Sequence, residues 1–132
     1  VLSQLKITIR TNYSNPPTHG AAVVAAVLNT PELRQQWEQE LGVMRARIKQ
    51  MREKLVEGLK AAGVQRDMSF ITQQIGMFSY SGLSKDQMVR LRSEFGVYGT
   101  DSGRMCVAAL NKKNIAYVCE AMAKVLDATV AA

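Results

Sequence analysis

Apolar residues recur every three or four positions along most of the chain, a spacing that predicts helices. The first predicted helix has Leu2, Leu5 and Ile9 on one face and ends near Asn12. It ends there because the following Ser-Asn-Pro-Pro sequence forces extended or turn geometry before each proline. A second helix is predicted to begin at Pro17. Its body, residues 20–28, is apolar on nearly every side, so we expect it to be buried against another surface.

A third and much longer helix is predicted from Thr30, which resembles an N-cap, and Pro31, which suits the first helical position. Apolar residues then recur at helical spacing as far as Gly63. At ~1.5 Å per residue the helix would be roughly 45 Å long, so we expect it to bridge two bodies. A coiled-coil arm is disfavoured, because the spacing follows no heptad and Gly42 and Gly58 interrupt it.

The pattern changes after Gly63. Residues 69–75 are compatible with helix or strand, whereas residues 76–82 alternate between flanking glycines and predict a strand. Ser84 and Gln87 form the sequence of a capping box, which predicts a helix that ends at Gly96.

The remaining elements are shorter. We predict a brief strand at 97–99, a turn at 100–103 and a strand at 104–109 with Arg104, Cys106 and Ala108 on one face. Asn111 is predicted to cap a last helix, and residues 127–132 are expected to fray. The second half is therefore predicted to be a compact α+β unit attached to the long helix.

Composition narrows the possible functions. The 132 residues include 17 basic and 11 acidic residues, for a net charge of +6, but the two signs are interspersed. No Lys/Arg-Gly-Phe/Tyr motif accompanies aromatics on adjacent strands, so we expect no nucleic-acid partner. The longest apolar run, residues 21–28, is too short to cross a bilayer, so we expect no membrane partner. Cys106 and Cys119 suggest neither a disulfide framework nor zinc, and no secretory segment is seen, so we expect a cytoplasmic protein. The chain opens inside a helical pattern at Val1, and we expect it to be a fragment.

Few residues could carry chemistry. The chain has a single histidine, His19, no carboxylate cluster at metal-ligand spacing and no glycine-rich phosphate loop, so we predict neither a metal site nor a catalytic residue. Arg104 begins a strand after a Ser-Gly turn, and its guanidinium could bind a carboxylate in a bidentate way. Pattern alone favours a binding site and a surface edge equally. Arg10 ends a helix, where the helix dipole favours arginine by itself.

Four stretches, in order and at matching separations, resemble the C-terminal region of aspartate and aromatic amino acid aminotransferases. They are RTNYSNPP (residues 10–17), GMFSYSGL (76–83), EFGVY (94–98) and SGRMCVA (102–108). The resemblance implies a fold-type I pyridoxal-phosphate (PLP) enzyme. Residues 1–43 would end its large domain and begin a bridging helix, and residues 44–132 would form its small α/β domain.

The resemblance also implies roles for individual residues. Arg104 would hold the α-carboxylate of the substrate, and Arg10 would reach into the partner subunit of a homodimer to meet a side-chain carboxylate. Phe78 would line the substrate site, with Ser14 and Asn15 at the subunit boundary. Asp101 departs from the family pattern and could compete for Arg104 if it turned inward.

The resemblance further implies that the Schiff-base lysine and the other cofactor-binding residues lie upstream. The eight lysines of this chain all fall on predicted helices or polar turns, where exposure is the default. We therefore predict that the chain alone does not catalyse transamination and contains no PLP-binding residues. The alternative is a non-enzymatic, basic α+β module for binding or dimerisation.

Overall fold

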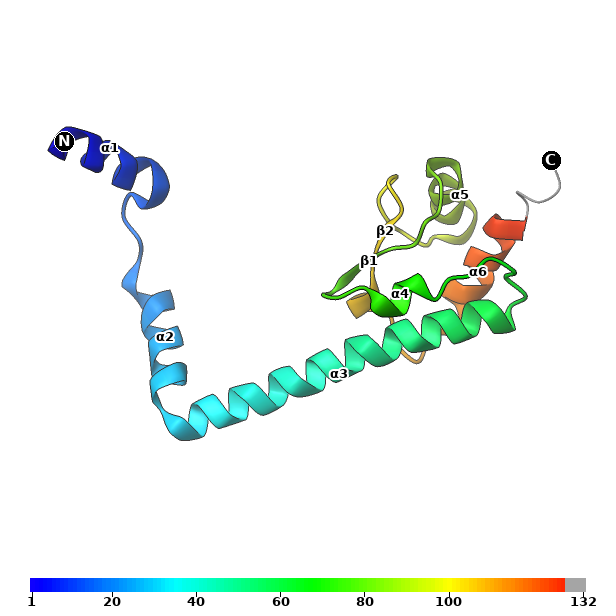
Figure 1. The fold of residues 1–132 in the computed structure, drawn as a ribbon, viewed down its shortest axis with the longest axis horizontal. Coiled ribbons are helices and arrows are strands. Elements are labelled where there is room, and N and C mark those ends of the chain that lie inside the picture. Colours follow the sequence, from blue (N-terminus) through cyan, green and yellow to red (C-terminus); the bar gives the residue numbers. More distant parts are fainter. Residues whose placement is uncertain (128–132) are drawn as a thin grey trace. The chain divides into compact units, whose positions relative to one another are not determined.

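The computed structural model of the protein describes residues 1–127. Figure 1 shows the order of the elements along the chain. The chain divides into two compact units, residues 1–42 and residues 43 onward. The expected fraying of the C-terminus lies outside the described residues, except for Asp127, which ends the last helix.

The first unit consists of α1 (Leu2–Tyr13), α2 (Thr18–Asn29) and the first turns of α3 (Pro31–Ala61). Pro17 is not helical but caps α2 with an extended backbone, so this helix begins one residue later than predicted. No residue of α1 or α2 is buried among the described residues. The chain itself therefore does not provide the cover that the apolar pattern of residues 20–28 predicts. No described helix is long and apolar enough to span a membrane.

The long predicted helix is confirmed as α3, which runs without interruption for 31 residues. Thr30 accepts the backbone N–H of Arg34 at 2.9 Å, so the helix begins where the Thr-Pro pair predicts. Its C-terminal half carries a buried stripe that includes Leu55 and Leu59. That half belongs to the second unit and contributes to its core.

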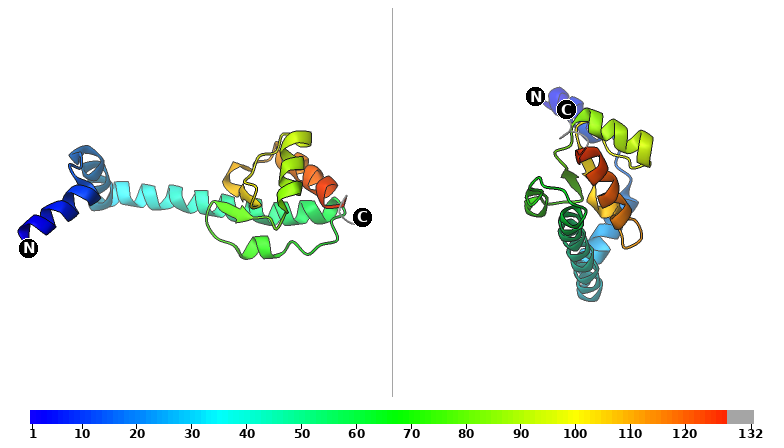
Figure 2. Two further views of the ribbon diagram at one scale, coloured as in Figure 1. Left: turned by 90° about the horizontal axis from the view of Figure 1, so that it is seen from above. Right: turned by 90° about the vertical axis from the view of Figure 1, so that its right-hand side faces the viewer.

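The second unit adds four helical elements and a small sheet to α3. They are α4 (Phe70–Gln73), β1 (Phe78–Tyr80), α5 (Lys85–Phe95), β2 (Arg104–Cys106), the 3₁₀ helix η1 (Val107–Ala109) and α6 (Ile115–Asp127). The two strands are antiparallel, and α6 lies against α3, as two views show (Figures 1 and 2). The largest fully buried apolar side chains are Leu55, Leu59, Ile71, Met88, Leu91, Met122, Val107 and Val125. The protein is thus mostly helical with one small sheet, consistent with the predicted α+β class.

The capping box of α5 is confirmed. The Ser84 hydroxyl accepts the Gln87 N–H, and the Gln87 side chain accepts the Ser84 N–H at 2.9 Å. At the other end Gly96 adopts a left-handed backbone with φ of 63°, which glycine tolerates without a Cβ clash. Local sequence is therefore sufficient to set both ends of this helix.

The predicted strands are too long. Residues 97–99 form no strand, because Thr100 closes a tight turn directly onto Arg104: its N–H donates to the Arg104 carbonyl at 3.0 Å. The strand predicted at 76–82 shortens to 78–80. The strand predicted at 104–109 ends at Cys106, since Arg47 of α3 donates to the carbonyls of Ala108 and Leu110 and residues 107–109 turn into η1. The ambiguous segment 69–75 contains the single turn α4.

Candidate carboxylate-binding site

The β1–β2 pair brings together two of the residues singled out in the sequence. Its register sets Phe78 opposite Cys106 and Tyr80 opposite Arg104. From this diagonal position the Arg104 guanidinium carbon lies 5.0 Å from the centroid of the Phe78 ring, a cation–π contact. Both side chains remain exposed to solvent, and Phe78 is 45% exposed. The Arg104 guanidinium thus lies over the Phe78 ring on an exposed surface of the sheet.

The turn before Arg104 holds its backbone in place. The Thr100 hydroxyl accepts the Arg104 N–H at 3.1 Å, and Gly103 donates its N–H to the Thr100 carbonyl at 2.9 Å. Gly103 has φ of 85°, and a Cβ at this position would lie 2.9 Å from the Leu83 carbonyl oxygen. The glycine that precedes the arginine is therefore required by backbone conformation and by close packing.

Asp101 does not compete for Arg104. Its carboxylate instead forms an ion pair with Arg92 of α5, with Nη1 and Oδ1 3.3 Å apart. Two further ion pairs occur within residues 1–127, and neither involves Arg104. The guanidinium thus has donors free for an external carboxylate, which it can bind in a planar, bidentate way.

A buried arginine that was not singled out from the sequence binds the strand that carries Phe78. Arg52 of α3 is only 2% exposed and donates four hydrogen bonds. Its Nη1 reaches the Ile71 carbonyl at 3.2 Å and the Ser79 hydroxyl at 2.9 Å, and its Nη2 reaches the carbonyls of Gly76 at 2.8 Å and Phe78 at 2.7 Å. Desolvation lowers the pKa of Arg52 from the ordinary arginine value.

The sequence does contain a signal for Arg52. With Ile48, Leu55 and Leu59 it falls at i, i+4, i+7 and i+11 of the long helix, which places it on the apolar stripe. A charged residue on a buried stripe needs partners, because an unpaired buried charge is costly. What the sequence did not reveal was the identity of those partners, which come from residues 71 to 79.

Gln74 completes the support of β1. Its Oε1 accepts the Ser79 hydroxyl at 2.6 Å and the Tyr80 N–H at 2.9 Å, and its Nε2 donates to the Tyr80 carbonyl at 3.0 Å. The Gln74 side chain therefore forms the two backbone hydrogen bonds with Tyr80 that a neighbouring strand would otherwise form. Within residues 1–127 no buried side-chain nitrogen or oxygen lacks a hydrogen-bond partner.

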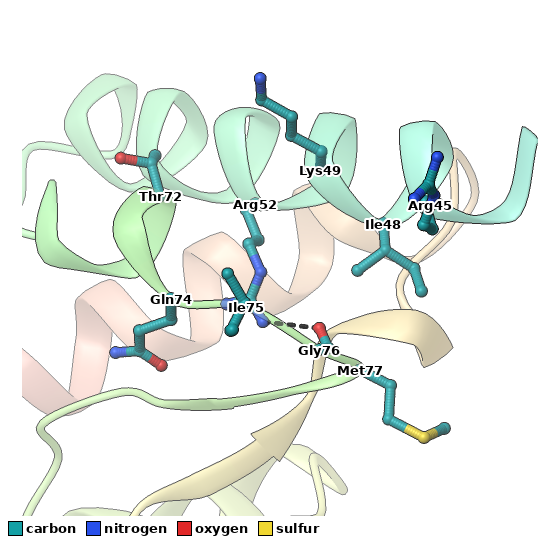
Figure 3. A pocket seen from close by; sticks show the side chains of 9 residues that line it. All are labelled: Arg45, Ile48, Lys49, Arg52, Thr72, Gln74, Ile75, Gly76 and Met77. Atoms are coloured by element: carbon teal, nitrogen blue, oxygen red, sulfur yellow. Dashed lines mark hydrogen bonds between the residues drawn. The ribbon is translucent and has the colours of Figure 1, made fainter. Parts of the chain in front are cut away.

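A cavity of about 370 Å³ opens beside Arg52, as Figure 3 shows. Its basic lining comes from Arg45, Lys49 and Arg52 of α3, and its apolar lining includes Ile75 and Met77. In the figure Arg52 reaches the Gly76 carbonyl from the helix, and the Ile75 side chain lies in front of it. Neither Arg104 nor Phe78 lines this cavity, so it is separate from the carboxylate site.

The remaining predicted site residues lie in the first unit. Arg10 is in the last turn of α1, Ser14 caps its C-terminal end and Asn15 follows in the loop before α2. All three are exposed and adjacent along the chain. Phe78 and Arg104 belong to the second unit.

The lysines and the single histidine of the described residues lie mostly at the surface. The lysines lie on helices or in turns, and all are exposed except Lys54, which is half-buried on α3. His19 is exposed, and residues 1–127 contain no group of three or more potential metal ligands. Among the described residues, Arg104 is thus the candidate for binding a carboxylate.

Comparison with known proteins assigns the chain to a family. Residues 1–122 match the model of the family described as aminotransferase class I and II. The chain belongs to this family, as the resemblance in the sequence indicated.

Individual relatives agree with this assignment. The chain is 62% identical over 126 residues to an aspartate aminotransferase of Pseudomonas aeruginosa, covering 96% of this chain and 32% of that protein. It is 52% identical to the aromatic-amino-acid aminotransferase of Escherichia coli, covering 96% and 32% of the two chains. The crystal structure of an aromatic-amino-acid aminotransferase from Burkholderia pseudomallei covalently bound to pyridoxal phosphate matches with a TM-score of 0.87 and 66% identity, over 95% of this chain and 31% of that one. The chain spans about a third of the length of the curated relatives that it matches.

Proposed function

We propose that this chain is part of a PLP-dependent aminotransferase, which exchanges an amino group between aspartate or an aromatic amino acid and a 2-oxo acid. The single observation that carries the proposal is Arg104, an exposed guanidinium mounted on Phe78 with no carboxylate partner within residues 1–127. Relatives named for aspartate and for aromatic amino acids support both substrate classes.

In this proposal Arg104 binds the α-carboxylate that every amino acid substrate carries. Two parallel N–H···O bonds fix the orientation of the carboxylate, and so they orient the Cα–H bond for reaction. Bound PLP would supply the electron sink for chemistry at Cα. The residues that hold PLP are proposed to lie outside this chain. Phe78 lines the substrate site and restricts the motion of the guanidinium.

Arg10 is proposed to meet the side-chain carboxylate of a dicarboxylic substrate in the partner subunit of a homodimer, with Ser14 and Asn15 beside it at the subunit boundary. A second arginine fork suits this role, because it recognises the opposite end of the same substrate. The exposure of all three residues supports contact with a group outside the chain.

The two units are proposed to have different roles in a cytoplasmic enzyme. We propose that residues 1–43 end a large domain and begin a bridging helix, and that residues 44–132 form the small domain that holds Arg104. The 132-residue chain alone is proposed to be inactive, since all of its lysines are exposed except the half-buried Lys54.

The full-length protein tests the proposal. We expect a visible absorbance band from bound PLP and a shift of that band on adding L-aspartate or L-phenylalanine. A full-length protein that is colourless after incubation with PLP would contradict the proposed function.

A further inference from the structure

We propose that Arg52 is a positioning residue for Arg104, acting through β1 and Phe78; this inference rests on the proposed function. None of the four hydrogen bonds of Arg52 goes to Arg104. It holds the backbone of the strand whose aromatic side chain carries the Arg104 guanidinium.

The hydrogen bonds of Arg52 converge on one short segment. Its two Nη atoms bind the carbonyls of Gly76 and Phe78 and the hydroxyl of Ser79, within four consecutive residues. Gln74 holds the next residue, Tyr80, through both its N–H and its carbonyl. Arg52 and Gln74 therefore bind the edge of β1 that faces away from β2. Their side chains form the backbone hydrogen bonds that another strand would otherwise form there.

The charge of Arg52 strengthens this attachment. All four acceptors are neutral, and none of the ion pairs within residues 1–127 includes Arg52. Hydrogen bonds from a buried cation to carbonyls are stronger than bonds between neutral groups. A lysine could not replace them, because its donors all lie on one nitrogen, whereas the guanidinium distributes them over a plane.

The position of β1 is transmitted to Arg104 by two contacts. The ladder pairs Tyr80 with Arg104, and the Phe78 ring lies 5.0 Å from the Arg104 guanidinium carbon. Movement of the Phe78 carbonyl would shift both the ring and the ladder. A misplacement of about 1 Å in a substrate-orienting group can lower the rate by about 100-fold.

The test uses Arg52→Lys in the full-length enzyme loaded with PLP. We expect kcat/KM to fall by about 10- to 100-fold for L-aspartate and L-phenylalanine alike, because both present the same α-carboxylate to Arg104. We expect the cofactor absorbance to remain. A loss confined to one of the two substrates would overturn the proposal.

Arg47→Lys is the matched control. Arg47 also lies on α3 and also donates to two backbone carbonyls, but these belong to residues that follow β2, and neither hydrogen bond goes to β1 itself. We expect a comparable loss of thermal stability with little change in kcat/KM. An equal fall in kcat/KM for both variants would show that Arg52 acts only through stability, and would overturn the proposal.

A double-mutant cycle separates positioning from general stability. If Arg52 acts through Arg104, then Arg52→Lys has little further effect on kcat/KM in an Arg104→Lys enzyme. A full and independent loss in that background would overturn the proposal. If Arg52→Lys fails to fold, Ser79→Ala replaces it, since it removes one acceptor and leaves three; we expect a smaller loss with the same dependence on Arg104, and additive losses would overturn the proposal.

The outcomes distinguish the two proposals. A PLP-loaded enzyme that loses activity on substitution of Arg104 but not of Arg52 retains the proposed function and overturns the positioning role. A full-length protein without transaminase activity overturns the proposed function itself.

Discussion

An arginine that recognises a carboxylate needs a free planar fork and a rigid support, and Arg104 has both. Phe78 lies under the guanidinium, and the Thr100 hydroxyl holds the Arg104 N–H. Asp101, the nearest acidic residue along the chain, is paired with Arg92 instead. The candidate site therefore depends on its neighbours as well as on Arg104, because the pairing of Asp101 with Arg92 leaves the Arg104 guanidinium without a carboxylate partner.

Replacing Arg104 by leucine in the full-length enzyme should raise KM and lower kcat/KM by several orders of magnitude. Each factor of ten corresponds to about 1.4 kcal/mol of lost transition-state binding. Steady-state kinetics with L-aspartate and L-phenylalanine measure the loss. Arg90→Leu is the control, because Arg90 forms only an exposed ion pair with Glu94 on α5, and surface pairs contribute little. An unchanged kcat/KM for Arg104→Leu would remove Arg104 from the site.

The two cysteines should differ in reactivity. Burial, with a smaller contribution from Glu120, raises the pKa of Cys119 to about 11, so little thiolate forms at pH 8. Brief treatment with iodoacetamide should modify Cys106, which is partly exposed, well before Cys119, and peptide mass spectrometry can compare the two. Equal rates would contradict the burial of Cys119.

The same pKa shift affects stability. An unfolded cysteine titrates near 8.5, below the folded value, so folding favours the protonated thiol. The contribution of Cys119 to stability should be fully present below about pH 8.5 and should be lost as the pH rises towards 11. Urea unfolding of the native protein and of Cys119→Ala between pH 7 and 10 would show the two converging as the pH rises.

At the scale of elements, α3 contains two glycines with opposite surroundings. A Cβ at Gly58 would lie 2.5 Å from the Cys119 sulfur of α6, whereas a Cβ at Gly42 would have no neighbour within 4 Å. Gly58 therefore allows two helices to pack closely. Both glycines have the same intrinsic cost in a helix, so their substitutions form a matched pair.

Gly58→Ala should destabilise the protein by about 1–3 kcal/mol, because overpacking exceeds the gain in helix propensity. Gly42→Ala should be neutral or stabilising by up to about 1 kcal/mol. Thermal unfolding of the two variants compares them directly, and Cys119→Ala should restore part of the stability lost in Gly58→Ala. Equal effects of the two substitutions would contradict the close α3–α6 packing.

Elements differ in how well the sequence predicted them. α3 and α5 were predicted closely, because apolar spacing, an N-cap and a terminal glycine are all local signals. The strands were predicted too long, because their ends depend on Thr100 and on Arg47, which binds carbonyls more than sixty residues away. Arg52 falls on the apolar stripe of α3, but its partners lie 19 to 27 residues further along the chain and could not be identified from the sequence.

At the scale of the whole molecule, the two units bury their apolar residues to different extents. The second unit has a continuous core, whereas α1 and α2 contain no buried residue among those described. Val24 is 57% exposed and Leu28 39% exposed. Apolar patches of this kind favour association.

The 132-residue chain alone should therefore self-associate, which size-exclusion chromatography with light scattering can measure. A combined Val24→Lys and Leu28→Lys variant should reduce the association by placing charges on the apolar face of α2. A combined Gln35→Lys and Gln39→Lys variant is the control, since it adds the same two charges at exposed polar positions. A clean monomer of the unmodified chain would contradict the prediction.

The sequence by itself determined the long helix, the capped helix α5 and membership of the aminotransferase family, and through that resemblance it singled out Arg104 as the main candidate site residue. These features depend on residues close together in the chain or on motifs in a fixed order. Only the tertiary structure decided that Phe78 lies under Arg104, that Asp101 pairs with Arg92, and that Arg52 is buried beneath β1. These contacts join residues 9 to 26 positions apart in the chain, and their geometry depends on how α3, α5, β1 and β2 pack together.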